Sequence, residues 1–184
     1  LSRCPPSATH RRHLHLHPEP SFQESKTSAY VADALRSMRI AFSDGWCADH
    51  GAAGLVAKVE GLDPGTRTMA LRADMDALPI QEVDRPHASA VPGWMHACGH
   101  DAHMSIIFHT LEWAVKNKNK LIRPLKFVFQ PAEEKIGGAS VMISEGVMQN
   151  PAVAEVYGLH IANRLPSGVL GVKSGISSAY CDEF

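Results

Sequence analysis

Hydrophobic residues recur at helical spacing in some segments of this chain and form short apolar runs in others. In segment 24–38 the apolar positions are three or four residues apart, which predicts an amphipathic helix. The same spacing predicts a helix over 103–116, and a shorter helix is expected over 139–148. Short apolar runs predict strands at 55–59, 68–73, 125–129, 156–159 and 169–173.

The order of these elements indicates the fold class. Strands that alternate with helices are typical of an α/β fold. Segment 125–129 is apolar except for Lys126, a pattern expected for a strand buried in a parallel sheet. We therefore expect a mostly parallel α/β sheet over residues 11–184, preceded by a disordered lead-in at residues 1–10.

Composition and charge exclude several classes of protein. The chain has 184 residues, of which 45% are hydrophobic and 20% charged, as in a globular domain. Lys and Arg number 18 against 19 Asp and Glu, so we expect neither a nucleic-acid partner nor a membrane partner. The four cysteines form no C-x-x-C pair and no secretory signal is present, which indicates free thiols and a cytoplasmic location.

Residues that commonly bind metals collect where the expected strands end. In an open α/β sheet, active sites form beyond the carboxyl ends of the strands. Such residues follow three expected strands and precede one expected helix: Asp74 and Asp76, Glu133 and Glu134, His160, and Cys98 with His100. Independent surface residues would not gather at successive strand ends, so the joint placement favours one site.

The residue types divide naturally into ligands and a base. Thiolate, imidazole and carboxylate together suit Zn²⁺, with Mn²⁺ or Co²⁺ where carboxylates dominate. Cys98 and His100 are two residues apart, so on an extended segment they point to the same side. The adjacent Glu133 and Glu134 diverge, so one can bind metal while the other stays free as a general base. Asp76 would orient a ligand.

Five segments carry a resemblance to a known family: LHLHPEPSFQE (14–24), ALRADMDALPIQE (70–82), MHACGHDAH (95–103), FQPAEE (129–134) and GLH (158–160). In order and spacing they resemble the amino-terminal part of the metal-dependent N-acyl-amino-acid amidohydrolases. That family includes hippurate hydrolase and the auxin-conjugate amidohydrolases, and it is related to aminoacylase and carboxypeptidase G. The resemblance implies an α/β metallopeptidase catalytic domain, truncated before a lid or dimerisation domain.

The resemblance also implies an activity and a cofactor. The family hydrolyses the amide bond of N-acyl amino acids, amino-acid conjugates or small peptides with divalent metal, Zn or Mn (or Co), two ions per complete site. Glu133 corresponds to the general base that activates a metal-bound water, and Asp76 corresponds to the orienting carboxylate. The metal ligands implied are Cys98, His100, Glu134 and His160. The expected partners are a small acyl-amino-acid substrate and, through a domain absent from this chain, a second subunit.

Other residues receive different expectations. Asp74 stands where related peptidases have the His of a His-x-Asp motif, and Asp101 and His103 take structural roles beside the ligands. His13, His15 and His17 alternate with leucines, which could suggest a metal-binding strand. The resemblance puts no ligand there, so we favour an ordinary strand-like entry segment.

Two competing functions remain at this stage. The first is a non-catalytic metal-binding fragment, because the last ligand and the lid of the family are absent from this chain. The second is a hydrolase that uses Cys98 as its nucleophile with a nearby His, which leaves Glu133 and Glu134 unexplained.

Overall fold

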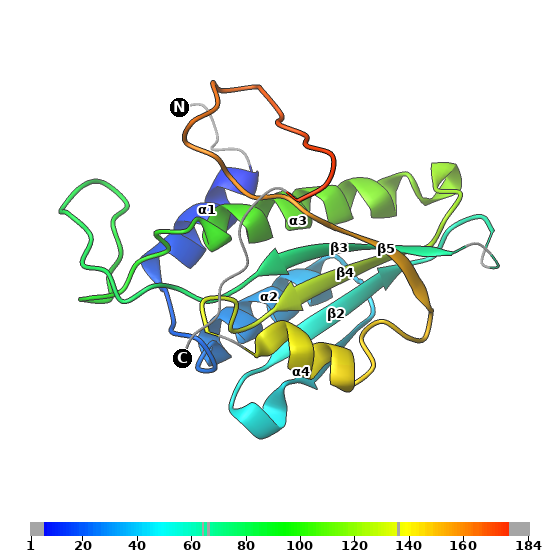
Figure 1. Ribbon diagram of the computed structural model, residues 1–184, viewed down its shortest axis with the longest axis horizontal. Coiled ribbons are helices and arrows are strands. Elements are labelled where there is room, and N and C mark those ends of the chain that lie inside the picture. The colour runs from blue at the N-terminus through cyan, green and yellow to red at the C-terminus, as the bar shows by residue number, and fades with distance from the viewer. Residues whose placement is uncertain (1–5, 64, 66, 136, 177–184) are drawn as a thin grey trace.

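The structure is a computed structural model, and it describes residues 6–63, 65, 67–135 and 137–176 (Figure 1). The helices and strands in these residues are α1 (Pro6–Leu16), α2 (Ser25–Ser37), β1 (Phe42–Trp46), β2 (Gly54–Val59), β3 (Thr68–Asp74), α3 (His100–Lys116), β4 (Leu125–Gln130), α4 (Gly138–Ser144) and β5 (Val153–Gly158), with short 3₁₀ helices η1 (Ala48–His50) and η2 (Lys118–Lys120). The predicted helix at 24–38 and four of the predicted strands are confirmed. None of the described helices has both the length and the apolar character needed to cross a bilayer.

The strands of the described residues form one mixed sheet, which confirms the α/β class. Their order is β1-β2-β4-β3-β5. The expected parallel arrangement holds among β3, β4 and β5, whereas β2 pairs antiparallel with both β1 and β4. Strand β1 has no apolar run, and the sequence pattern did not reveal it. The register pairs Asp74 with Gln130 and Arg72 with Gly158, so the parallel strands end together.

The central strand β4 divides the core into two layers. Leu125, Phe127 and Phe129 pack on the side covered by α1, α2 and α3. Val128 faces the other side and packs with Met142 of α4. Figure 1 shows these helices in the same arrangement around the sheet. All six residues of β4 are buried, which agrees with its wholly apolar central run.

The entry segment is a helix, so the strand-like prediction for residues 13–17 is wrong. Leu14 and His15 are neighbours in sequence and both are buried, at 2% and 4% exposure. A half-buried strand would place adjacent side chains on opposite faces, whereas a helix can bury both. Helix α1 also includes residues 6–10 of the expected lead-in, and residues 1–5 lie outside the described residues.

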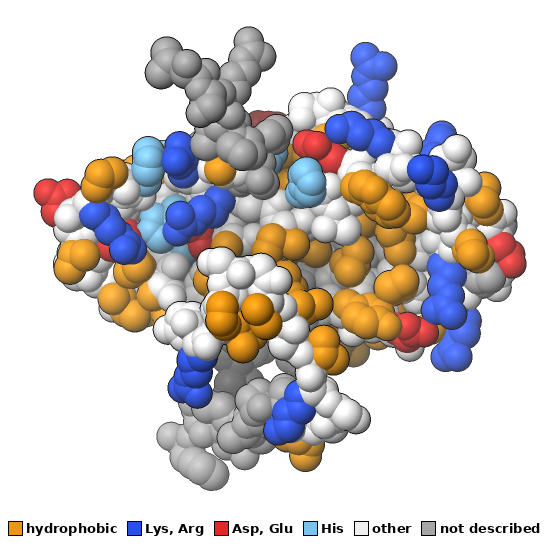
Figure 2. Space-filling model, turned by 90° about the horizontal axis from the view of Figure 1, so that it is seen from above, with side chains coloured by type: hydrophobic (Ala, Val, Ile, Leu, Met, Phe, Trp, Pro, Cys, Tyr) orange, Lys and Arg blue, Asp and Glu red, His pale blue; other side chains and the backbone are white. Residues whose placement is uncertain are grey.

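The carboxyl-terminal part of the described chain is exposed. Residues 161–176 contain neither helix nor strand, so the strand predicted at 169–173 is wrong. Val169 and Val172 are 54% and 88% exposed, and no described strand lies beside them to supply backbone partners. Strand β5 is an edge strand with large exposed side chains, and Figure 2 shows hydrophobic side chains gathered near the middle of the view from above.

Candidate metal centre

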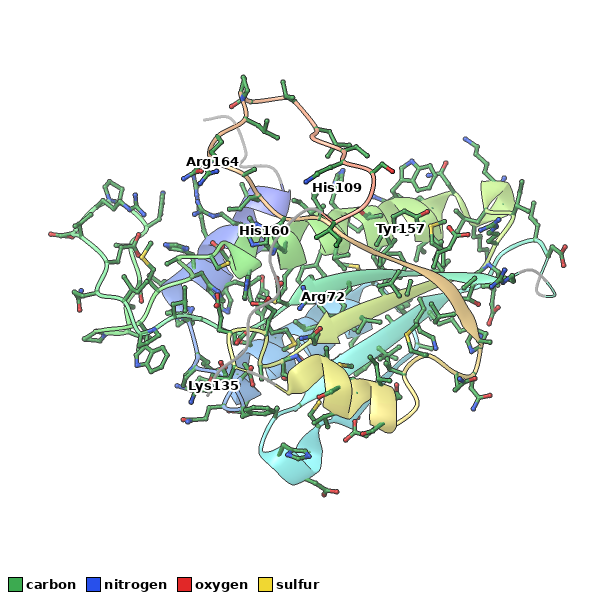
Figure 3. The ribbon with its side chains drawn as sticks, viewed as in Figure 1. Arg72, His109, Lys135, Tyr157, His160 and Arg164 are labelled. Atoms are coloured by element: carbon green, nitrogen blue, oxygen red, sulfur yellow. The ribbon has the colours of Figure 1, made fainter. Side chains whose placement is uncertain are left out.

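The parallel strands bring the predicted site residues to one edge of the sheet. Asp74 ends β3, Glu133 and Glu134 follow β4, and His160 follows β5. His100 is the first residue of α3, which packs against β3. In Figure 3 His160 lies over the start of α3, above the ends of the strands. The topology therefore brings these residues to the same edge of the sheet.

His100 lies fully buried at the centre of the group. Its Nδ1–H donates to the backbone carbonyl of Asp76 at 2.8 Å, which leaves the lone pair on Nε2. Nε2 lies 3.6 Å from Glu134 Oε1 and 3.7 Å from Glu133 Oε2. Among the described residues, His100 Nε2 and Glu134 Oε1 have no hydrogen-bond partner. Two buried acceptors that face each other are stabilised by a cation between them.

Cys98 lies near His100 and Glu134, and His160 lies beside Cys98. The Sγ atom of Cys98 lies 3.2 Å from His160 Nε2. The other ring nitrogen of His160 donates to the carbonyl of Ile161 at 2.7 Å, so its lone pair faces the sulfur. Donor atoms of Cys98, His100 and Glu134 all lie within 4.8 Å of one another. Donor atoms of Cys98, His100 and Glu134 therefore lie around one point, with His160 against the sulfur of Cys98. This set of thiol, imidazole and carboxylate groups suits a divalent cation.

A second group, Asp74 with His100 and His103, also has donor atoms within 4.8 Å of one another. Both nitrogens of His103 are already engaged, however. The amide of Ile161 donates to Nε2 at 3.0 Å, so the proton lies on Nδ1 and is donated to Asp74 Oδ1 at 2.7 Å. Asp74 Oδ2 accepts from the guanidinium of Arg72 at 2.6 Å. Because the lone pair of His103 is used, the group that contains Cys98 is the better cation site.

Asp76 holds both sides of the site. Its Oδ2 accepts from the hydroxyl of Ser21 at 2.7 Å and from the backbone amide of Glu134 at 2.9 Å. Burial alone would raise the pKa of Asp76, but hydrogen bonds from His100 and Ser21 lower it below its usual value. The ionised carboxylate thus fixes the position of Glu134, while the backbone carbonyl of Asp76 holds His100.

Burial and nearby carboxylates raise the pKa of the Cys98 thiol to about 12. At neutral pH the thiol therefore stays protonated unless a cation binds it. This environment argues against the cysteine-nucleophile hypothesis, because a nucleophilic cysteine needs a lowered pKa. Burial also raises the pKa of Glu134, in part offset by His100.

The two adjacent glutamates lie at similar distances from His100 but differ in exposure. The Glu134 side chain is 20% exposed, whereas that of Glu133 is 40% exposed. Glu133 therefore keeps a solvent-facing carboxylate beside the buried donors. A carboxylate in this position can accept a proton from a water molecule.

Glu24 is fully buried, and no sequence pattern singled it out as a functional residue. Its Oε1 accepts the backbone amide of Ala132 at 2.7 Å, at the turn that leads into the two glutamates. Ala132 has φ of 51°, a left-handed conformation that such a bond helps to maintain. Glu24 closes the first segment that carries the family resemblance, and this position was the available signal.

The loop after Asp76 is tied to α1 by buried charges. His15 lies between Asp101, at 2.8 Å, and Glu82, at 3.1 Å. Hydrogen bonding to Asp101 is the largest effect on the pKa of His15 and raises it, against the effect of burial. Arg11 also donates to Asp101 at 2.9 Å. Asp101 thus has the structural role that was expected.

Comparison with known proteins gives the family. Residues 70–176 match the model of peptidase family M20/M25/M40, and the chain belongs to this family. The chain is 42% identical to "Thermostable carboxypeptidase 1" of Saccharolobus solfataricus over 95% of its length, which is 44% of that relative. It is 41% identical to "N-acyl-L-amino acid amidohydrolase" of Geobacillus stearothermophilus, with 95% and 46% of the two chains covered.

A solved structure agrees with this assignment. The YxeP protein of Bacillus subtilis, described as a dinuclear metal binding peptidase from the M20 family, superposes with a TM-score of 0.84 at 39% identity. The match covers 92% of this chain and 46% of that one. The chain therefore spans slightly less than half the length of the relatives that it matches. The predicted family is confirmed.

Proposed function

We propose that the protein hydrolyses the amide bond of N-acyl amino acids, or of related amino-acid conjugates and small peptides, with divalent metal. One observation carries the proposal: donor atoms of Cys98, His100 and Glu134 lie within 4.8 Å of one another, with His160 against Cys98 and the Glu133 carboxylate 3.7 Å from His100. The names of the relatives support the same substrate class.

The chain's own residues divide the work as follows. Cys98, His100, Glu134 and His160 would hold the metal, which when bound polarises the substrate carbonyl and makes water more acidic. Glu133 takes a proton from the attacking water and passes it to the leaving amine nitrogen. Asp76 holds His100 through its backbone carbonyl and Glu134 through its carboxylate.

The identity and number of the ions belong to the proposal. The thiol and two imidazoles favour Zn²⁺, and the carboxylates also allow Mn²⁺ or Co²⁺. We propose two ions per complete site. The description of YxeP as a dinuclear metal binding peptidase supports this number. A cytoplasmic location and a homodimer through a domain outside this chain stay predictions, and the free thiols of Cys47 and Cys98 support the first.

Metal content and turnover together test the proposal. The chain is purified without chelator, its metal is measured by plasma mass spectrometry, and amine release from N-acetyl amino acids is followed. Bound metal with turnover that Glu133→Gln abolishes supports the proposal. Bound metal without turnover supports the alternative of a non-catalytic metal-binding fragment. Absence of both in the wild-type chain would contradict the proposal for this chain.

A further inference from the structure

The segment that carries His160 has little regular structure to hold it. Strand β5 pairs with β3 only as far as Gly158, opposite Arg72. His160 itself is exposed, and the described residues beyond it form no helix or strand. Something other than the sheet must therefore fix the imidazole beside Cys98.

His103 provides that contact. Its Nε2 accepts the backbone amide of Ile161 at 3.0 Å, and its ring meets the ring of His160 edge-on with centroids 4.7 Å apart. The Ile161 side chain packs over Gly99, where an added Cβ would lie only 2.1 Å from Ile161 Cδ1. Two separate contacts thus fix the residue that follows His160.

The hydrogen bond from the Ile161 amide to His103 requires one tautomer of the His103 ring. Nε2 can accept the Ile161 amide only while the proton is on Nδ1, where Asp74 Oδ1 receives it at 2.7 Å. Arg72 donates to the other oxygen of Asp74 at 2.6 Å and also to Gln130 at 2.9 Å. The guanidinium has no acceptor, so Asp74 must present an oxygen to Arg72.

We propose that His103 is a positioning residue that fixes His160 beside Cys98, with Asp74 and Arg72 setting the required tautomer. The assignment of His160 as a metal ligand rests on the proposed function, but the hydrogen-bond chain does not. His103 is 3% exposed, and it acts through the backbone amide of Ile161 rather than on a substrate.

Substitution of Asp74 gives a specific signature. In Asp74→Asn the amide oxygen must face Arg72, because two donors would otherwise meet. The amide NH₂ then faces His103 Nδ1, which becomes an acceptor and moves the ring proton to Nε2. That proton meets the Ile161 amide, and the hydrogen bond is lost. A purely structural role for Asp74 predicts no such change of tautomer.

His103 variants separate the acceptor from the ring. His103→Gln keeps an acceptor near the position of Nε2, whereas His103→Ala removes it. His109 is exposed farther along the same helix, as Figure 3 shows, and His109→Ala is the matched control.

Two measurements decide the proposal. In metal-free protein, hydrogen exchange of the Ile161 amide should rise about fivefold to tenfold in His103→Ala and Asp74→Asn, the effect of one hydrogen bond. It should stay near wild type in His103→Gln and His109→Ala. ¹⁵N NMR of the His103 ring should show the proton on Nδ1 in the wild type and on Nε2 in Asp74→Asn. Unchanged Ile161 exchange in His103→Ala overturns the proposal.

Cobalt binding then tests the consequence for the site. Co²⁺ affinity should fall roughly 10- to 100-fold in His103→Ala, with an altered visible spectrum, and recover in His103→Gln. Wild-type affinity and spectrum in His103→Ala overturn the positioning role. If the wild type binds no Co²⁺, the proposed function fails, and the exchange and NMR results alone decide the role of His103.

Discussion

Glu24 should make the stability of the metal-free protein depend on pH. Its carboxyl group is fully buried, with one oxygen on the Ala132 amide and the other without a partner among the described residues. Burial raises its pKa from the usual 4.5 to about 7, although the Ala132 amide acts in the opposite direction. Between these two values the folded protein keeps a proton that the unfolded chain has released.

The sign and size follow from proton linkage. Because the folded state binds the extra proton, stability falls as pH rises from 4.5 through 7. The loss attributable to Glu24 is about 3 kcal/mol, at 1.36 kcal/mol for each pH unit between the two pKa values. A loss of this size is a large part of the stability of an ordinary domain.

The assay compares wild type with Glu24→Gln. Gln keeps the acceptor for the Ala132 amide and cannot ionise. Any other effect of the substitution on stability is therefore the same at both pH values and cancels in the comparison. Urea unfolding followed by tryptophan fluorescence, with chelator present, should show wild-type stability falling relative to Glu24→Gln by about 3 kcal/mol between pH 4 and pH 8. Glu60→Gln, at a side chain 64% exposed, controls for general loss of a carboxylate. If the difference in unfolding free energy between wild type and Glu24→Gln is the same at pH 4 and pH 8, the reasoning is refuted.

Three further predictions concern the metal centre. Glu133→Gln should keep metal and lose turnover, whereas Glu134→Ala should lose metal; metal analysis beside amine release separates the two, and metal retained in Glu134→Ala counts against its ligand role. In metal-free protein at pH 8, iodoacetamide should alkylate Cys98 about 100-fold more slowly than a peptide thiol, because burial raises its pKa to about 12; peptide mass spectrometry measures the rate, and equal rates exclude the raised pKa. Gly99→Ala should lower the free energy of unfolding in urea more than Gly93→Ala does. Both glycines have positive φ, but only Gly99 lies under a packed side chain, that of Ile161. Equal losses of unfolding free energy would show that the contact between Gly99 and Ile161 is unimportant.

The arrangement of the site could be predicted because it follows from topology. Parallel strands end at one edge of a sheet, so residues after β3, β4 and β5 must lie near one another. The apolar run 127–129 of β4 and the proline after the strand were visible in the sequence. Residue type and the resemblance then made Cys98, His100, Glu134 and His160 the candidate ligands.

What the sequence hid depends on distant contacts. Glu24 meets Ala132 across 108 residues, and His103 meets Ile161 across 58. No local period encodes such pairs. The alternating residues of α1 misled for a similar reason: His15 is buried because Asp101 and Glu82 pair with it, which a local pattern of polar and apolar residues cannot show.

The position of β3 within the sheet has a consequence during protein synthesis. Both of its partners, β4 and β5, come later in the chain, and residues 75–124 must be made before β4 begins. At roughly 5–20 residues per second, β3 therefore waits about 3–10 s on the ribosome with both of its backbone edges unpaired. Such edges can pair with other chains, so the nascent protein is exposed to aggregation during this interval.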